Sequence, residues 1–272
     1  MKKYLLLLLL ICAGFFYSAM PETKSRVIRV GVECDHEPYN WEETSQTDSN
    51  FPLVNNPGFF AEGYDVQMAA LVAGKIGATL EFHKVKWDDL LNALNRREID
   101  AIFSGMVDTY ERKNIIAFSI PYEVRKTEYS VLVSRKGRYA GARTLKDFSG
   151  ARILGQKGSH FDEVIDQIPG VVHVAPLDTQ TAVINAMTKF DVDGVVLNRD
   201  TAESCARTYP GLTVVSFDDD EGFDLGFNGL CAGFRKTDAE LVSEVNYAIN
   251  SITMRERRRV MDQVIKRVWE DI

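Results

Sequence analysis

The chain has 272 residues, with 32 lysines and arginines against 39 aspartates and glutamates and a formal net charge of -7 at pH 7. Because 45% of the residues are apolar and 26% are charged, the chain is too apolar for a disordered protein and too polar for a polytopic membrane protein. The length predicts one large domain or two modest ones. A nucleic-acid-binding protein normally carries a basic surplus, so the acid excess argues against a nucleic-acid partner.

The first 19 residues are typical of a signal peptide. Met1-Lys2-Lys3 is a positively charged start, residues 4–17 form a nearly unbroken apolar run, and Ser18-Ala19 supplies small residues for cleavage. A transmembrane anchor is the alternative, but the run is shorter than the ~20 residues that a bilayer requires. Cys12 leaves a lipid anchor open, although Ile11 stands where a small residue normally precedes a lipidated cysteine. We expect an exported protein that is periplasmic or associated with the cell envelope.

Short β-rich runs then alternate with amphipathic helical patterns along the chain. The pattern predicts strands at 26–32, 79–82, 99–103, 130–133, 151–155, 171–174 and 194–197. It predicts helices at 64–76, 87–94, 161–168, 181–189 and 201–209. Such alternation is typical of an α/β fold, in which helices cover parallel strands.

Three further segments lie outside this alternation. Residues 43–57 are rich in Ser, Thr, Asp and Asn and contain two prolines, which predicts a polar surface loop. Thr237-Asp238-Ala239-Glu240 has the spacing of a capping box and predicts the start of an amphipathic helix, and a final helix follows it. A basic cluster near the start of that final helix, interpreted as a solvated face, comprises Arg255, Arg257, Arg258 and Arg259.

The sequence carries no recognisable catalytic or cofactor motif. It has no phosphate-binding loop, dinucleotide-binding glycine pattern, zinc-protease helix or nucleophile elbow, and its four histidines show no metal-ligand spacing. Cys34, Cys205 and Cys231 follow the signal segment, and this odd, widely spaced set is interpreted as buried free thiols, with a bridge between Cys205 and Cys231 left open. We expect no metal and no cofactor, although folding could still assemble a catalytic pair.

Polar residues follow one predicted strand, at the sheet edge where α/β folds place their ligand crevices. They run from Ser104-Gly105 through Val107-Asp108-Thr109 to Arg112. Thr109 is placed to cap a short helix that carries Arg112. A lone arginine is usually a surface cation, but behind a tight Ser-Gly turn it can present its planar guanidinium group to a carboxylate.

Motifs along nearly the whole mature chain resemble, in order, those of the family 3 extracellular solute-binding proteins, the polar amino-acid receptors of ABC importers. Five motifs lie in the first unit and two continue the resemblance into the second. They are Glu62-Gly63-Tyr64-Asp65-Val66, residues 87–94, residues 99–102, Gly105-Met106-x-x-Thr109-x-x-Arg112 and Phe118-Ser119-Ile120-Pro121-Tyr122, followed by 144–150 and 155–159.

The resemblance implies an α/β, two-lobed periplasmic-binding-protein type II fold in which the chain crosses the hinge twice. Lobe one would comprise residues 26–131 and 229–272, and lobe two residues 132–228. Such a protein would capture an amino acid between the lobes, act as a monomer without a cofactor, and deliver the ligand to an ABC permease in the membrane.

The resemblance also implies which residues bind the ligand. Arg112 would clamp the α-carboxylate, together with backbone N–H groups at Val107 and at Ser159-His160 on a helix N-terminus. Trp87 would pack on the ligand side chain, with a core tryptophan as the alternative, and the Gly105 carbonyl would hold the ammonium group. The implied ligand-binding set is Glu33, His36, Trp87, Ser104, Gly105, Val107, Arg112, Ser159, His160 and Asn198.

Three positions depart from the family pattern. Asn198 replaces the usual acidic residue, Val107 replaces serine or threonine, and His160 stands where threonine is common. Asn198 keeps a hydrogen-bond acceptor but lacks the charge that would neutralise the ligand ammonium group, and a hydrogen bond to a charged group contributes about 1.5–3 kcal/mol. Asp108 and Asp200 are candidate substitutes.

The ligand side chain is predicted from Glu33 and His36. Glu33 aligns with an acidic residue that basic-amino-acid receptors of the family use against a distal cation, and His36 aligns with a stacking aromatic, so the predicted ligand is Lys, Arg or His. The alternative is that Glu33 is a surface charge at a strand end. Two other functions stay open: a cyclohexadienyl dehydratase-like enzyme on the same fold, with His160 as acid or base, and an amino-acid sensory module that acts through a partner.

Overall fold

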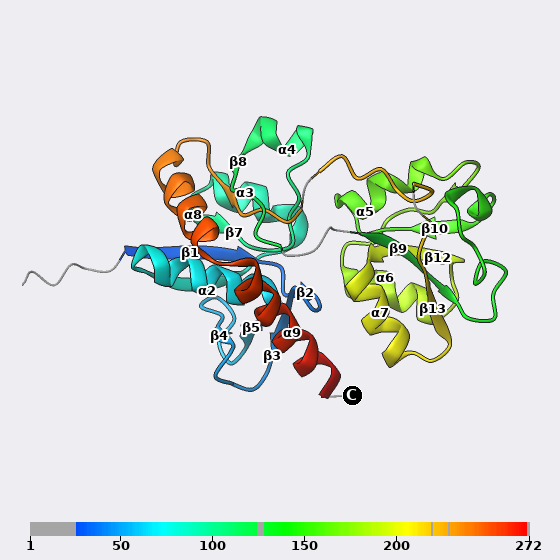
Figure 1. Ribbon diagram of the computed structural model, residues 1–272, viewed down its shortest axis with the longest axis horizontal. Coiled ribbons are helices and arrows are strands. Elements are labelled where there is room, and N and C mark those ends of the chain that lie inside the picture. The colour runs from blue at the N-terminus through cyan, green and yellow to red at the C-terminus, as the bar shows by residue number, and fades with distance from the viewer. Residues whose placement is uncertain (1–25, 124–127, 219, 228, 271–272) are drawn as a thin grey trace, which may run out of the picture.

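The computed structural model describes residues 26–270, apart from 124–127, 219 and 228, and shows two lobes side by side (Figure 1). Each lobe is built on a five-stranded sheet with helices packed against it. The predicted signal peptide, residues 1–19, and Cys12 lie outside the described residues. Within the described part, no helix is both long and apolar enough to cross a membrane.

The sheet of lobe one has the strand order β6-β1-β7-β14-β8. Its strands are β1 (Arg26–Val32), β6 (Ala78–Lys84), β7 (Ala101–Ile102), β8 (Ala117–Phe118) and β14 (Gly233–Phe234). Strand β1 runs parallel to β6 and β7, whereas β14 runs antiparallel to β7 and β8. Because β1 and β7 are parallel neighbours, the residues that follow them lie at the same edge of the sheet.

Helices α2 (Tyr64–Ile76), α8 (Ala239–Ser251) and α9 (Met254–Glu270) share one core with this sheet. The apolar stripe predicted for α2 is confirmed, since Val66, Ala69 and Ala73 are buried. A 3-10 turn (Trp87–Asp89) leads into α3 (Leu90–Asn95), which packs with β7 in a smaller cluster. Helix α4 (Tyr110–Ile115) follows β7. The spacing of apolar residues in the sequence therefore predicted these helices correctly where the apolar stripe extended over enough residues.

A four-stranded sheet adjoins lobe one where the sequence predicts a loop. It contains β2 (Asp35–His36), β3 (Asn40–Glu43), β4 (Phe51–Pro52) and β5 (Phe60–Glu62), in the order β2-β3-β5-β4. The surface loop predicted at 43–57 is wrong in part, because β4 lies within it and Leu53 is buried. The Phe51 ring packs against Phe82 of β6, with 5.2 Å between centroids. These strands are too short to show a period in the sequence, and packing against β6 determines them.

The sheet of lobe two has the strand order β11-β10-β12-β9-β13. Its strands are β9 (Tyr129–Ser134), β10 (Arg152–Leu154), β11 (Val172–His173), β12 (Gly194–Asn198) and β13 (Leu212–Val215). Helices α5 (His160–Glu163), α6 (Gln180–Thr188) and α7 (Arg199–Thr208) accompany it. The helix predicted at 161–168 is wrong in its second half, where the chain tightens into a 3-10 turn (Val164–Gln167). Strand β13 was not predicted.

The chain passes between the two sheets twice. It leaves the first sheet after β8, enters the second at β9, and returns from β13 to β14. Helices α8 and α9, drawn in orange and red, then lie beside the N-terminal elements of lobe one (Figure 1). The predicted two-lobed α/β fold with a doubly crossed hinge is confirmed, while the exact boundaries of the lobes stay a prediction.

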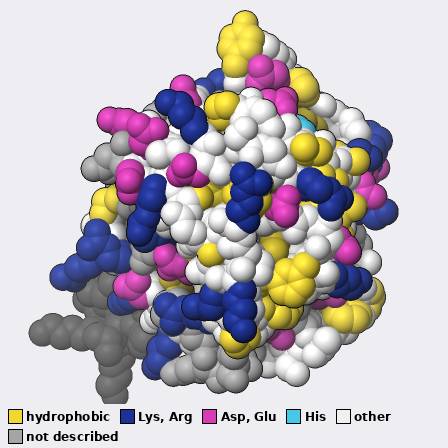
Figure 2. Space-filling view, turned by 90° about the vertical axis from the view of Figure 1, so that its right-hand side faces the viewer, with side chains coloured by type: hydrophobic (Ala, Val, Ile, Leu, Met, Phe, Trp, Pro, Cys, Tyr) yellow, Lys and Arg dark blue, Asp and Glu magenta, His cyan; other side chains and the backbone are white. Residues whose placement is uncertain are grey.

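The end of the molecule formed by lobe two carries charges of both signs. In the face that Figure 2 shows, basic and acidic side chains are interspersed with scattered apolar ones. Among the side chains visible in that view, neither sign of charge forms a continuous field. This mixture fits a chain whose acid excess is spread over its surface.

The start of α8 differs from the prediction. Asp238 is the N-cap of this helix, and its side chain makes no capping hydrogen bond. Thr237 Oγ1 instead donates to Asp238 Oδ1 at 3.0 Å. The predicted capping box is therefore wrong, because Thr237 lies one residue before the position from which its hydroxyl could cap the helix.

Arg257 is buried, so the prediction of a solvated basic face is wrong at this position. Its guanidinium group donates to the backbone carbonyls of Ile252 at 3.1 Å, Pro121 at 3.3 Å and Ile249. Arg258, the next residue, is exposed. A sequence pattern cannot separate these neighbours, because only the packing of α8 against α9 decides which arginine turns inward.

The predicted free thiols are confirmed. Cys34, Cys205 and Cys231 are buried and form no disulfide with one another. Burial raises the pKa of each thiol to about 12, so none of them is ionised at neutral pH. These residues act as small apolar side chains of the two cores.

Arg257→Ala should lower the free energy of unfolding by about 2–3 kcal/mol, because it removes charge-assisted hydrogen bonds and leaves buried carbonyl oxygens without that donor. Arg258→Ala removes the same side chain from an exposed position and should change stability by less than about 0.5 kcal/mol. Urea unfolding followed by circular dichroism measures both variants. Equal losses would contradict a structural role for Arg257.

Candidate functional site

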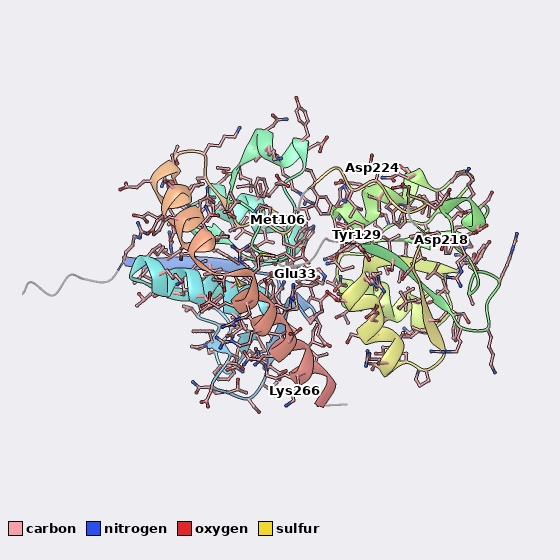
Figure 3. The ribbon with its side chains drawn as sticks, viewed as in Figure 1. Glu33, Met106, Tyr129, Asp218, Asp224 and Lys266 are labelled. Carbon is pink, nitrogen blue, oxygen red and sulfur yellow. The ribbon has the colours of Figure 1, made fainter. Side chains whose placement is uncertain are left out.

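Residues that follow β1 and β7 meet lobe two across the space between the lobes, where Glu33 and Tyr129 lie at facing edges (Figure 3). The backbone N–H of Glu33 donates to Ser104 Oγ at 2.9 Å, which ties the two strand ends together. From lobe two, Gln156 Nε2 donates to Glu33 Oε1 at 2.6 Å. Glu33 is only 6% exposed, so the alternative of a surface charge is wrong.

Burial controls the protonation of Glu33. The pKa of its carboxyl group is raised to about 8, mainly by burial and then by the Asp35 carboxylate, while the hydrogen bond from Gln156 acts in the opposite direction. At neutral pH this carboxyl group therefore holds its proton for much of the time. A cation beside it would favour the ionised form.

Arg112 lies in α4, and the predicted cap at Thr109 is confirmed. The Thr109 side chain accepts a hydrogen bond from the backbone N–H of Arg112 at 3.4 Å. The Arg112 guanidinium group is buried and donates to the carbonyl oxygens of Val107 at 3.1 Å and Gly158 at 3.2 Å. Burial lowers the pKa of Arg112, which still remains a cation. Among the described residues, no carboxylate accepts a hydrogen bond from this group.

Trp87 connects Arg112 to lobe two. Its indole Nε1 donates to the Gly158 carbonyl at 3.0 Å, and its ring centroid lies 5.3 Å from Arg112 Cζ in a cation–π arrangement. The ring also packs against the smaller core cluster of lobe one. Trp87 therefore packs on a core, as one of the two predicted alternatives has it, and also reaches the opposite lobe, while its contact with the ligand side chain stays a prediction.

The loop at 156–159 forms the lobe-two side of the site. Ser159 is the N-cap residue of α5, and its Oγ donates to the Gln156 carbonyl at 2.6 Å. Gly158 has a φ of 66°, in the left-handed region that favours glycine. The Gln156 side chain and the Gly158 carbonyl of this loop both contact lobe one.

His36 and Asn198 make a second contact between the lobes. Asn198 Nδ2 lies 3.3 Å from His36 Nε2, and the His36 ring packs edge-on against Phe161 at 5.8 Å. Burial lowers the pKa of His36 to about 3, so the ring is neutral and an unprotonated Nε2 can accept from Asn198. Asn198 is 2% exposed, yet its Oδ1 has no hydrogen-bond partner in the described chain.

Gly105 sits against the His36 ring, where a side chain would not fit. Its φ is 64°, and a Cβ at this position would lie 3.0 Å from His36 Nδ1. The Gly105 backbone also hydrogen-bonds to the buried Asp65 carboxyl group, which accepts from Tyr122 Oη at 2.7 Å and from Asn40 Nδ2 at 2.8 Å. Burial raises the pKa of Asp65 to about 7. This network of hydrogen bonds holds the turn at Gly105 in place.

His160 lies among aromatic side chains. Its ring centroid is 5.6 Å from that of Tyr129 and 5.1 Å from that of Phe227. Within the described residues its Nδ1 has no partner, and its Nε2 is 4.0 Å from Glu163 Oε2. Burial, and then the positive charge of Arg112, lower the pKa of His160 to about 4. The imidazole is therefore neutral at pH 7 and lacks a carboxylate that would orient it for proton transfer.

The remaining candidates occupy different surroundings. The Val107 side chain belongs to the core of lobe one, so the carbonyl of this residue, which accepts from Arg112, faces the site. Asp108 Oδ2 forms an ion pair with Lys113 Nζ at 2.6 Å. Asp200 Oδ2 accepts from Tyr39 Oη at 3.3 Å across the lobes. Asp108 is thus already paired with a cation.

The structure brings most of the predicted residues into one contact network. Sequence reasoning missed Gln156 and Gly158 as contacts between the lobes, although both belong to the motif at 155–159 that carried part of the resemblance. It also missed Phe161, whose ring meets His36. No group of three or more His, Cys, Asp or Glu side chains in the described part of the chain could hold a metal ion.

Comparison with known proteins shows which family the chain matches and which proteins it resembles. The chain matches the bacterial extracellular solute-binding proteins, family 3, over residues 28–263. It is 30% identical over 169 residues to the arginine-binding extracellular protein ArtP of Bacillus subtilis, covering 60% of this chain and 59% of that protein. It is 27% identical over 253 residues to the putative ABC transporter arginine-binding protein 2 of Escherichia coli, covering 93% of each.

A solved structure has the same fold. The amino acid ABC transporter substrate-binding protein AbpA from Streptococcus pneumoniae, bound to L-arginine, aligns with a TM-score of 0.74 at 19% identity, covering 89% of this chain and 95% of that one. Two lobes with a polar network between them define a ligand-capturing receptor. The protein belongs to the bacterial extracellular solute-binding proteins, family 3.

Glu33 should make the separation of the lobes depend on pH. Its pKa is about 8 in this arrangement, against 4.5 for a glutamate exposed to water. Protonated Glu33 therefore favours contact between the lobes fully below about pH 4.5, and this contribution is lost as the pH rises through about 8. The radius of gyration of the ligand-free protein, measured by small-angle X-ray scattering, should increase between about pH 5 and pH 9.

Glu33→Gln cannot ionise, so its radius of gyration should change much less over the same pH range. Glu240→Gln makes the same change at an exposed position of α8 and should follow the parent protein. An expansion of equal size in Glu33→Gln would show that another group controls the separation of the lobes.

Proposed function

We propose that this protein captures an amino acid with a cationic side chain between its lobes and delivers it to an ABC permease in the membrane. The observation that carries the proposal is the buried guanidinium group of Arg112, whose hydrogen-bond partners in the described chain are carbonyl oxygens. A buried charge is costly unless an opposite charge accompanies it. The α-carboxylate of an amino acid would supply that charge through two parallel hydrogen bonds to the planar guanidinium group.

The ligand ammonium group would bind on the side of Asn198. Its Oδ1 is a buried acceptor without a partner in the described chain. An amide oxygen accepts a hydrogen bond but contributes no net charge. We therefore propose that the carboxylate and the ligand side chain contribute more to affinity here than the ammonium group does.

The ligand side chain would bind Glu33 through its positive charge. This buried carboxyl group contacts the neutral amide of Gln156, and burial keeps its pKa near neutrality. A ligand cation would replace the proton, whereas a neutral side chain would leave the carboxyl group protonated. Two relatives that are named as arginine-binding proteins support a cationic ligand.

Ligand capture would be coupled to closure of the lobes. Arg112 and Glu33 belong to the side of the site built on the first sheet, whereas Asn198 belongs to the second sheet. A ligand that contacts both sides binds more tightly when the lobes are close together, so it shifts the population towards the closed form. The permease would recognise that closed form.

The other two functions have less support. An enzyme on this scaffold would need an oriented acid or base, and His160 packs against Tyr129 and Phe227 without such an orienting group. The relatives from Bacillus subtilis and Escherichia coli are named as binding proteins. We further propose that the protein is exported and acts outside the cytoplasmic membrane as a monomer without enzymatic activity; the extracellular family supports the location.

Arg112→Ala should weaken binding of L-arginine by at least about 100-fold, since each charge-assisted hydrogen bond to the α-carboxylate contributes about 1.5–3 kcal/mol. A thermal-shift screen of the purified protein against all amino acids identifies the ligands, because a ligand that binds the folded state raises its stability. Isothermal titration calorimetry then compares the parent with Arg112→Ala and with the exposed control Arg258→Ala. Unchanged affinity in Arg112→Ala would refute the carboxylate site.

Glu33→Gln should weaken arginine about tenfold to a hundredfold and affect citrulline, a neutral analogue of similar shape, much less. Calorimetry in buffers of different ionisation enthalpy should also detect proton release when arginine binds the parent protein near neutral pH, because bound arginine favours the ionised form of Glu33. The variant should release no such proton. Equal losses for arginine and citrulline would rule out recognition of charge by Glu33.

A further inference from the structure

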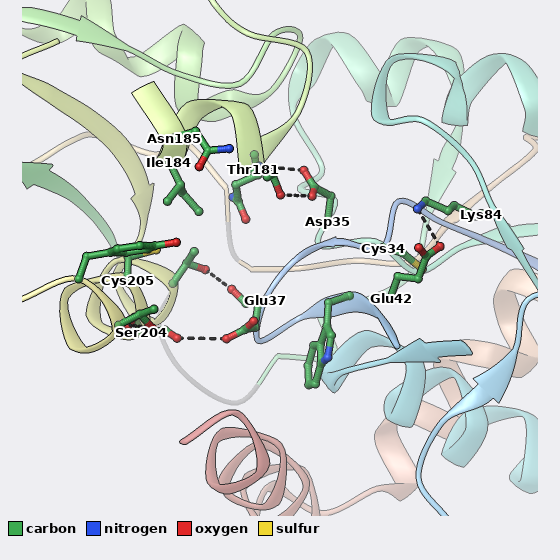
Figure 4. A pocket seen from close by; sticks show the side chains of 15 residues that line it. Cys34, Asp35, Glu37, Glu42, Lys84, Thr181, Ile184, Asn185, Ser204 and Cys205 are labelled. Atoms are coloured by element: carbon green, nitrogen blue, oxygen red, sulfur yellow. Dashed lines mark hydrogen bonds and ion pairs between the residues drawn. The ribbon is translucent and has the colours of Figure 1, made fainter. Parts of the chain in front are cut away.

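A second cavity of about 460 Å³ lies between the lobes, apart from the central site around Arg112 and Glu33. None of the ten predicted ligand-binding residues lines it. Its walls come from β2 and the turn that follows it on one side and from α6 and α7 on the other, where Asp35 and Glu37 face Thr181, Ile184, Asn185 and Ser204 (Figure 4). The volume falls within the range of roughly 300–1,000 Å³ that is usual for small-molecule sites.

Gln180, the first residue of α6, is among the residues that line this cavity, and its buried amide group is unsatisfied in the described chain. The residue is 1% exposed, and neither Oε1 nor Nε2 has a hydrogen-bond partner in the described chain. Leaving a buried polar group unpaired costs about 1–3 kcal/mol, so native proteins rarely do it without a reason. A polar molecule in the cavity would give Gln180 both an acceptor and a donor.

The charged groups of the cavity favour a cation. Asp35 accepts hydrogen bonds from the backbone N–H of Thr181 at 2.9 Å and from its hydroxyl, and Glu37 Oε1 accepts from Ser204 Oγ at 3.2 Å. All of these donors are neutral, so neither acidic side chain is paired with a cation through these bonds. Burial raises the pKa of Glu37, as expected for a carboxyl group without a cationic partner.

Glu42 differs, because it forms an ion pair with Lys84 Nζ at 2.8 Å on the same cavity wall. Within the described part of the chain, the only lysine or arginine that lines the cavity is thus already paired. A ligand with an ammonium or guanidinium group would meet two acidic side chains at one end and the Gln180 amide within the same cavity.

We propose that this cavity is a second binding site, which takes a small organic cation carrying an ammonium or guanidinium group. Glu37 and Asp35 accept hydrogen bonds from the cation, and Gln180 pairs with a polar group of the same molecule. Because both lobes supply walls, the bound cation stabilises the closed arrangement. The effect on closure rests on the proposed function, in which an amino acid is captured as the lobes close. The amino acid and the organic cation would then each raise the affinity of the protein for the other.

The test uses 1,4-diaminobutane as the probe and 1,4-butanediol as its neutral counterpart, both titrated by calorimetry at constant ionic strength. The diamine should bind the parent protein, and the diol should bind at least tenfold more weakly. Glu37→Gln should weaken the diamine about tenfold or more, and Gln180→Leu severalfold, whereas the exposed control Glu240→Gln should not change its affinity. Circular dichroism verifies that each variant is folded.

Arg112→Ala separates this site from the central one. The diamine has no carboxylate, so its affinity should survive Arg112→Ala while the affinity for arginine is lost. Loss of diamine binding in Arg112→Ala, equal binding of the diol, or no effect of Glu37→Gln and Gln180→Leu would overturn the second site. If arginine fails to bind the parent protein but the diamine binds in a Glu37-dependent way, the proposed amino-acid ligand is wrong and the second site stands.

Discussion

Burial of ionisable side chains between the two lobes is the constraint on which the rest of the structure depends. Glu33 and Arg112 are 6% and 7% exposed, yet neither forms an ion pair with another described side chain. Their partners are an amide group and carbonyl oxygens, which offer dipoles but no net charge. Ionisable groups held in this way respond strongly to a ligand that brings the opposite charge, because the surrounding dielectric constant is low.

The contacts that join the lobes are mostly single hydrogen bonds between neutral groups or between one charged and one neutral group. Trp87 reaches the Gly158 carbonyl, Thr181 reaches Asp35, and the Thr201 hydroxyl donates to the Glu37 carbonyl at 2.8 Å. Each such bond contributes only about 0.5–1.5 kcal/mol net, or somewhat more where one partner is charged. The apolar clusters, in contrast, lie mostly within one lobe or the other, although Phe227 packs against a cluster of each. The interface between the lobes is therefore weaker than the packing inside each lobe, as opening and closing would require.

Local sequence patterns predicted the elements whose information is local. The stripe on α2 and the cap at Thr109 were correct, because helix periodicity and capping depend on residues three or four positions apart. Strands β2 to β5 were missed, since their pairing partners are distant and their lengths are only two to four residues. Arg257 was misassigned for a related reason, as its burial depends on carbonyl groups from other segments.

The sequence by itself determined the family, the two-lobed α/β fold and the residue types available for ligand binding, because ordered motifs over most of the chain carry that information. Only the tertiary structure decided that Glu33 faces Gln156. It also decided that, in the described chain, Asn198 Oδ1 beside His36 and the amide group of Gln180 at the second cavity have no hydrogen-bond partner. These features depend on burial and on contacts between residues more than a hundred positions apart. No local pattern encodes them, because desolvation and cross-lobe distances exist only once the lobes are assembled.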